Sequence, residues 1–222
     1  MTVKAAFEAN WVDLEKSLPI AEQPSVLTGI YQPKSNIAVW QRSLSVDLTQ
    51  SIQEMLQGGL HLALVKSVTP HNAAELIRDK LSGYACADAL GQDVAMLVDM
   101  FCCLFDLREA GLRLTSLDNA MCPKFHVDQV PCRLVTTYVG SATQWVENDH
   151  VDRCKLGVNS AGQLDHLSGL LKTDTAINQM EQGDVALLKG TGWEGNEQTG
   201  LVHRSPEITA CNRRLLLTLD LM

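Results

Sequence analysis

Residues 122–128 read CPKFHVD and lead, after a short connection, into RLVTTYV at residues 133–139. The second run is rich in β-branched residues and is followed by Gly140, a pattern typical of a β-strand. In extended backbone, residues i and i+2 point to the same side, so His126 and Asp128 can reach one metal ion. This stretch therefore predicts a metal-binding edge in a β-rich region.

One imidazole and one carboxylate do not complete a metal site. His203, in a later strand-like segment, is the best third ligand in the sequence. Two histidines and one carboxylate on one side of an ion leave its other positions open, the arrangement used by non-haem Fe(II) oxygenases. Arg213 and Arg214 follow His203 by ten and eleven residues, and either guanidinium can pair with a carboxylate of a bound co-substrate.

The bulk composition narrows the classes of partner. The 222 residues are 45% hydrophobic and 20% charged, as in an ordinary globular protein. The formal net charge of −8 argues against nucleic acid or an anionic membrane as partner and leaves a small molecule or a protein as substrate. The N-terminus lacks the apolar run of a signal peptide, and no stretch of about 18 apolar residues is present. Seven cysteines without a C-x-x-C pair favour reduced thiols, so we expect a cytoplasmic protein.

The first half of the chain has mainly helical periodicity. Apolar residues at helical spacing predict helices at about 47–58, 69–83 and 90–110, with Thr69-Pro70 as the start of the second. Short apolar runs at 37–40 and 60–65 predict one or two strands. We therefore expect residues 1–110 to form a mostly helical layer.

The second half changes to short strands separated by glycine turns. Strands are predicted at 112–117, 133–139, 185–189 and 213–221, and the polar stretch 148–180 is an insert that can serve as a lid. Several strands without intervening helices favour a barrel or a jelly roll over a parallel sheet. The prediction is an α+β protein of one domain, 1–222, in which the helical layer packs on a jelly-roll-like metal-binding core at 111–222.

Two resemblances support this interpretation. The segments CPKFHVDQVPCRLVTTYVG, GDVALLKGTGWEGN, LVHRSP and RRLLLTLDL resemble a bacterial family known only as domain of unknown function 1826, from about VLTGIYQPKSNIAVWQR onward. More remotely, residues 110–222 resemble the double-stranded β-helix, a cupin-type fold, of 2-oxoglutarate/Fe(II)-dependent oxygenases. This second resemblance implies Fe(II) and 2-oxoglutarate as cofactors, His126, Asp128 and His203 as metal ligands, and no catalytic residue beyond them.

The same resemblance implies a clamp for 2-oxoglutarate at Arg213 or Arg214. Arg214 is preferred because it shares a strand face with Leu216 and Thr218, whereas Arg213 shares a face with leucines that are expected to pack. Thr218 resembles the small hydroxyl residue of the family's pocket. Tyr138 is expected to hydrogen-bond the co-substrate, as a tyrosine does in some members.

Other interpretations remain open at this point. Two histidines and an aspartate also suit zinc, which predicts a non-catalytic, cupin-like zinc-handling protein as the alternative. A degenerate jelly roll acting as an interaction module is a third possibility. Arg213 and Arg214 can instead form surface salt bridges, with Asp220 as one partner. The loop 190–196 lacks the lysine of a phosphate loop and either lines a pocket mouth or forms a turn.

Overall fold

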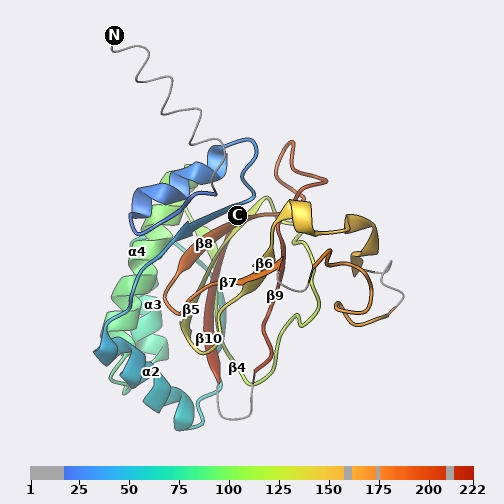
Figure 1. The fold of residues 1–222 in the computed structure, drawn as a ribbon. Coiled ribbons are helices and arrows are strands. Elements are labelled where there is room, and N and C mark those ends of the chain that lie inside the picture. Colours follow the sequence, from blue (N-terminus) through green and yellow to red (C-terminus); the bar gives the residue numbers. More distant parts are fainter. Residues whose placement is uncertain (1–17, 158–161, 174–175, 209–212) are drawn as a thin grey trace, which may run out of the picture.

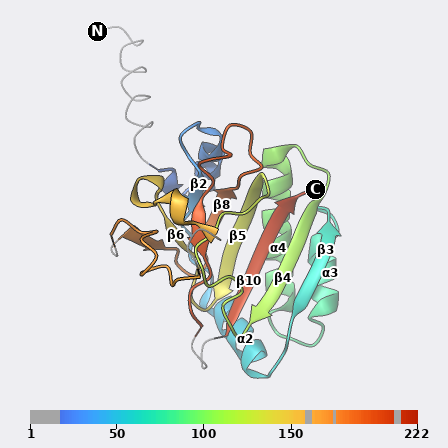
Figure 2. The ribbon, with the colours of Figure 1, turned by 90° about the vertical axis from the view of Figure 1, so that its right-hand side faces the viewer.

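Two sheets of unequal size organise the protein (Figures 1 and 2). The computed structural model describes residues 18–157, 162–173, 176–208 and 213–222. The larger sheet contains, in spatial order, β1 (Ile20–Ala21), β2 (Ile37–Trp40), β8 (Val185–Lys189), β5 (Cys132–Val139), β10 (Arg214–Leu221), β4 (Ala110–Leu117) and β3 (Ala63–Val68). All neighbours pair antiparallel except β1 and β2. The smaller sheet has the order β7 (Ile177–Gln179), β6 (Gln144–Val146), β9 (Val202–Arg204).

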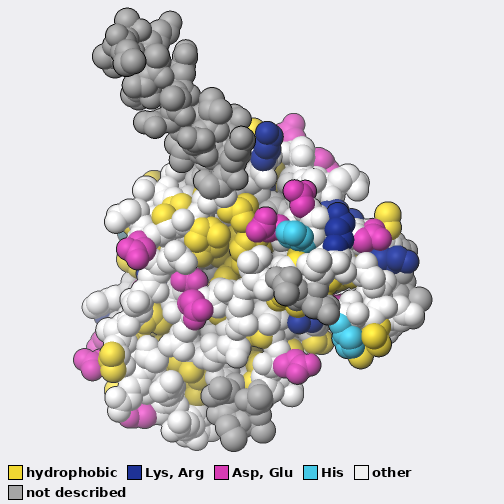
Figure 3. All heavy atoms as spheres, viewed as in Figure 1, with side chains coloured by type: hydrophobic (Ala, Val, Ile, Leu, Met, Phe, Trp, Pro, Cys, Tyr) yellow, Lys and Arg dark blue, Asp and Glu magenta, His cyan; other side chains and the backbone are white. Residues whose placement is uncertain are grey.

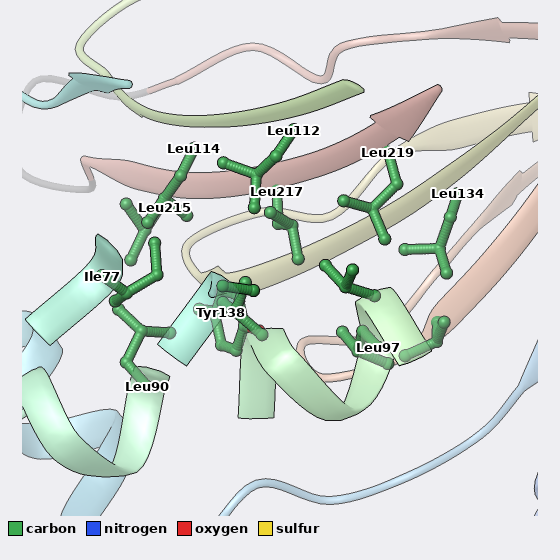
Figure 4. Packing of buried hydrophobic residues seen from close by; sticks show 14 of the residues in the cluster. Ile77, Leu90, Leu97, Leu112, Leu114, Leu134, Tyr138, Leu215, Leu217 and Leu219 are labelled. Carbon is green, nitrogen blue, oxygen red and sulfur yellow. The ribbon is translucent and has the colours of Figure 1, made fainter. Parts of the chain in front are cut away.

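The helices cover one face of the larger sheet (Figure 1). They are the 3-10 helix η1 (Pro24–Tyr31) and the α-helices α2 (Val46–Gln57), α3 (Ala73–Lys80) and α4 (Ala87–Phe105). Their apolar sides meet alternate residues of the sheet, and Figure 4 shows Ile77, Leu90 and Leu97 facing Leu134, Leu215 and Leu217. These residues are almost fully buried, and removing such apolar surface from water is the main driving force for this layer.

The smaller sheet covers the opposite face of the larger one. Trp145 of β6 packs in one cluster with Val135 of β5, Ala186 of β8 and Leu216 of β10. The segment after β6, with the short turns η2 (Asn148–His150) and η3 (Arg153–Lys155), packs on the outer side of the smaller sheet through a separate cluster. Helices thus cover the outer face of the larger sheet, and this segment covers the outer face of the smaller one.

Local signals explain where two helices begin and end. The hydroxyl of Ser45 accepts a hydrogen bond from the amide of Leu48 at 3.2 Å, so α2 begins at Val46 and Ser45 is its cap. Asp106 adopts the left-handed conformation with φ of 52°, which ends α4 at Phe105. The predicted helix 90–110 is therefore too long at its end, and residue Ala110 already begins β4.

The N-terminal half is not only a helical layer. It contributes β1, β2 and β3 to the larger sheet, where β2 pairs with β8 and β3 pairs with β4. The sequence predicted one or two strands in this mostly helical part, whereas its described residues contribute three, and these pair with strands of the second half in one sheet. The second predicted helix also begins at Ala73, three residues after Pro70.

Within the described residues, no helix combines the length and the apolar character that crossing a bilayer requires. On the face shown in Figure 3, Lys and Arg side chains lie among Asp and Glu side chains.

Candidate metal centre

A pair of backbone hydrogen bonds joins the two histidines of the predicted triad. The amide of His126 donates to the carbonyl of His203, and the amide of His203 donates to the carbonyl of His126, both at 3.0 Å. This antiparallel bridge places a residue of the segment before β5 beside a residue of β9, and the ring centroids lie 4.5 Å apart. The pairing explains how two histidines far apart in the sequence meet.

Each imidazole is oriented by its own backbone. Nδ1 of His126 donates to the carbonyl of Lys124 at 3.0 Å, and Nδ1 of His203 donates to the carbonyl of Leu201 at 3.1 Å. Because a carbonyl only accepts, the proton of each neutral ring sits on Nδ1. Both Nε2 atoms therefore keep a free lone pair, the form of histidine that binds metals.

The carboxylate of Asp128 faces both Nε2 atoms. Oδ1 lies 3.7 Å from Nε2 of His126, and Oδ2 lies 3.6 Å from Nε2 of His203. One ligand atom from each residue falls within 4.8 Å of the others, so the three side chains can hold a metal ion. Burial lowers the pKa of His203 to about 4, and the nearby Asp128 carboxylate offsets only part of this shift. His203 is thus neutral and able to ligate at neutral pH, and the donor set fits a divalent ion.

The glycine-rich loop after β8 supports the backbone that carries Asp128. The amide of Thr191 donates to the carbonyl of Asp128 at 2.9 Å. A Cβ atom at Gly190 would lie 2.1 Å from the carbonyl oxygen of Val130, and one at Gly200 would lie 2.4 Å from a methyl of Val127. Only glycine permits this close approach. The sequence allowed a pocket mouth or a turn here. The structure forms successive turns, which pack against the backbone around Asp128.

Arg133 is a residue of this site that the sequence did not indicate. Its Nη1 donates to Oδ2 of Asp128 at 2.7 Å, and its Nε and Nη2 donate to the two carboxylate oxygens of Asp220 at 2.7 and 2.9 Å. Asp220 was considered as a partner of Arg213 or Arg214, and it pairs instead with Arg133. Their pairing depends on the register of β5 against β10, which no local sequence pattern specifies.

Arg214 is fully buried between the two sheets. Its guanidinium donates to Oγ1 of Thr137 at 2.9 and 3.2 Å, to Oγ1 of Thr143 at 2.8 Å and to Oγ of Ser205 at 3.4 Å. Burial lowers the pKa of Arg214 to about 10. Among the residues that the structure describes, no carboxylate pairs with it. Ser205 stands two residues after His203, so Arg214 borders the segment that carries a predicted metal ligand.

Sequence comparison assigns a family. A family model described as "Protein of unknown function (DUF1826)" matches residues 21–220. The chain belongs to this family. No curated protein matches the sequence.

Solved structures of similar shape have low sequence identity. A rice dioxygenase for auxin oxidation is 10% identical over 89% of this chain and 78% of its own, with a TM-score of 0.49. The 2-oxoglutarate complex of dioxygenase for auxin oxidation 1 from Arabidopsis thaliana is 12% identical over 93% and 94%, with a TM-score of 0.48. A Pseudomonas putida prolyl-4-hydroxylase is 12% identical over 92% and 97%, with a TM-score of 0.42. At these values, the likenesses establish neither the fold nor the activity of this chain.

Three further residues were predicted to bind the co-substrate, and the structure separates them. Thr218 is buried on the same face of β10 as Leu216 and Arg214. Arg213 lies elsewhere, because it forms an ion pair with Asp118 and donates to the carbonyl of Leu56 at the end of α2. Its placement contradicts a role as clamp.

Tyr138 also lies away from the triad. Its hydroxyl donates to Oδ2 of Asp93 in α4 at 2.6 Å, and its ring packs in the cluster under the helices (Figure 4). The expectation that Tyr138 contacts a co-substrate is therefore wrong for this structure. The physical reason is strand alternation, because Tyr138 shares its face of β5 with Leu134, which also packs under the helices.

Proposed function

We propose that this protein is an Fe(II)- and 2-oxoglutarate-dependent oxygenase acting on a small molecule or a protein. The observation that carries the proposal is a buried arginine, Arg214, without a carboxylate partner among the described residues, next to a segment that supplies a metal-ligand candidate. The triad alone also suits zinc, but zinc binding by itself does not account for a buried arginine without a carboxylate partner among the described residues.

Chain topology supports the finer description of the fold. From β4 onward the chain passes repeatedly from one sheet to the other. The larger sheet contains β4, β5, β8 and β10, and the smaller sheet contains β6, β7 and β9, with the His126 segment paired beside β9. Eight such segments form a double-stranded β-helix, the jelly roll of this proposal.

The guanidinium of Arg214 is chemically incomplete as it stands. A buried cation without a counterion is unfavourable, because hydroxyl groups replace only part of its hydration. Three hydroxyls, from Thr137, Thr143 and Ser205, hold it in one orientation. A carboxylate of 2-oxoglutarate would supply the missing negative charge, and arginine binds carboxylates in a fixed two-pronged geometry.

The roles of the other residues follow. Bound Fe(II) would supply open coordination positions and the redox chemistry of oxygen activation. His126, Asp128 and His203 would hold the ion through the two Nε2 atoms and a carboxylate oxygen. Val135 and Leu216 face the same interior and keep water from it.

A pair of neighbouring substitutions tests the proposal. Arg214→Gln removes the buried charge, and we expect the affinity for 2-oxoglutarate in the Fe(II)-loaded, oxygen-free protein to fall by about 100-fold, equivalent to ~3 kcal/mol for a charged hydrogen-bond pair. Arg213→Gln is the matched control, because Arg213 pairs with Asp118 outside the interior, and its affinity should stay unchanged. Calorimetric titration and succinate release from 2-oxoglutarate give the two readouts.

Metal analysis separates the alternatives. Protein purified without a histidine tag should contain iron or bind Fe(II), and 2-oxoglutarate should then give a weak visible charge-transfer band. Tight zinc binding with no response to 2-oxoglutarate would instead favour the non-catalytic metal-binding function.

A further inference from the structure

One guanidinium connects the candidate metal ligand Asp128 to a second carboxylate. Arg133 donates from Nη1 to Asp128 and from Nε and Nη2 to Asp220, all between 2.7 and 2.9 Å. The Asp220 pair is two-pronged, which fixes the plane of the guanidinium as well as its position. The direction of the remaining donor toward Asp128 is fixed as a consequence.

The sheet holds this connection in place. Arg133 of β5 and Asp220 of β10 stand directly opposite each other in the antiparallel register, close to the end of the pairing. Both lie on the face that meets the smaller sheet, as do Val135 and Leu216 on the same strands. About a quarter of each side chain is exposed, 26% for Arg133 and 27% for Asp220, whereas only 14% of the Asp128 side chain is. The pair is thus more exposed than the carboxylate that it contacts.

We infer that Arg133 and Asp220 are positioning residues for the metal centre. Arg133, anchored by Asp220, engages Oδ2 of Asp128 and directs the carboxylate to offer a single oxygen to the ion. Asp220 also cancels the charge of Arg133, which would otherwise repel a cation. This inference rests on the proposed metal site.

Charge and orientation make separate contributions. Histidine binds a metal ion as the neutral imidazole. In the loaded site the charge therefore comes from Asp128, Arg133 and Asp220, which together carry one negative charge and attract a dication. Replacing Asp220 by asparagine removes this net charge and frees Arg133. Replacing Arg133 by glutamine at the same time restores one negative charge, on Asp128, but leaves its carboxylate without the arginine donor. The two variants therefore separate electrostatic attraction from positioning.

The experiment is an anaerobic titration of the full-length protein with Fe(II), repeated with Co(II), whose visible spectrum reports coordination geometry. We expect Asp220→Asn to weaken Fe(II) binding by about 10- to 100-fold, the usual effect of losing a partner of a metal ligand. Arg133→Gln/Asp220→Asn should stay at least about tenfold weaker than wild type. Its Co(II) spectrum at saturation should differ from that of wild type.

Asp93→Asn is the matched control. Asp93 accepts a two-pronged pair from Arg42 at 2.6 and 3.0 Å on the helical side of the larger sheet. This variant should lose thermal stability without any change in metal affinity. An equal loss of metal affinity in Asp93→Asn would overturn the inference, because it would reveal general destabilisation.

The other outcomes are also decisive. Wild-type affinity in the double variant would show that charge alone matters and would refute positioning. Wild-type affinity in both Asp220 variants would refute both contributions. Failure of the wild-type protein itself to bind Fe(II) or Co(II) would remove the proposed metal site, and that result is visible before any variant is made.

Discussion

Burial of His203 couples the protonation of one imidazole to the stability of the fold. Its pKa is about 4 in the folded protein, below the ordinary 6.5, because burial disfavours the charged ring. Between pH 6.5 and 4 the unfolded chain binds a proton that the folded chain does not. The stabilisation is thus complete above about pH 6.5 and is lost as the pH falls toward 4.

This linkage predicts a change in unfolding free energy. Lowering the pH from 7 to 5 should cost the metal-free protein about 2 kcal/mol through His203. Urea unfolding of wild type and His203→Gln at both pH values measures it, and the variant should lose this part of the pH dependence. Equal pH dependence in the two proteins would contradict the assignment.

Tyr138 provides a second test at the scale of single residues. Its hydroxyl and the guanidinium of Arg42 both donate hydrogen bonds to the carboxylate of Asp93. Burial, and after it the negative charge of Asp93, raises the pKa of Tyr138 well above its ordinary value. Tyr138→Phe should lower the free energy of unfolding by about 1–2 kcal/mol, because a buried hydrogen bond is lost. Its affinity for 2-oxoglutarate should match that of wild type. A weakened affinity would restore the role that resemblance had suggested.

At the scale of elements, the loop after β8 fixes the position of Asp128. In Gly190→Ala the added methyl would collide with the backbone around Val130, so the Asp128 segment must move. We expect metal affinity to fall by about tenfold or more and stability by about 1–3 kcal/mol. Metal titration and thermal unfolding measure the two effects. Gly58→Ala is the control, because its Cβ would make only ordinary contacts at 3.4 Å at the end of α2, and metal affinity should not change.

Elements with strong local patterns were predictable from the sequence. The β-branched and leucine-rich runs at 133–139, 185–189 and 213–221 are confirmed as β5, β8 and β10, and the spacing of His126 and Asp128 correctly placed both on one side. Elements of two or three residues, such as β1 and β6, are too short for any period to show. Alternation with Leu134 also places Tyr138 on the helical side of β5, in agreement with the structure and against the role that the resemblance implies.

At the scale of the whole molecule, the parts that sequence could not supply depend on long-range register. Arg133 meets Asp220, and Arg214 meets Thr137, only because β5 pairs with β10 in one particular alignment. That alignment also contains a shift between Leu215 and Leu216. Alternation excludes alignments shifted by one residue, because they would turn the leucines to the other face. No local pattern chooses among alignments that differ by two residues, since each would bury a similar set of leucines.

The interleaving of strands also predicts how the molecule unfolds. In a fragment of residues 111–222, β4 would lose β3 and β8 would lose β2, and the leucine face of β10 would lose the helices that cover it. Exposed edges and an uncovered apolar face are unstable in water, so we expect this fragment not to fold alone.

In the full chain, Trp40 in β2 and Trp145 in β6 report on different sheets. Urea transitions followed by the fluorescence of single-tryptophan variants and by far-UV circular dichroism should coincide, because the sheets share one core. Two separated transitions, or a fragment with the native near-ultraviolet spectrum, would show instead that the C-terminal half is an independent domain.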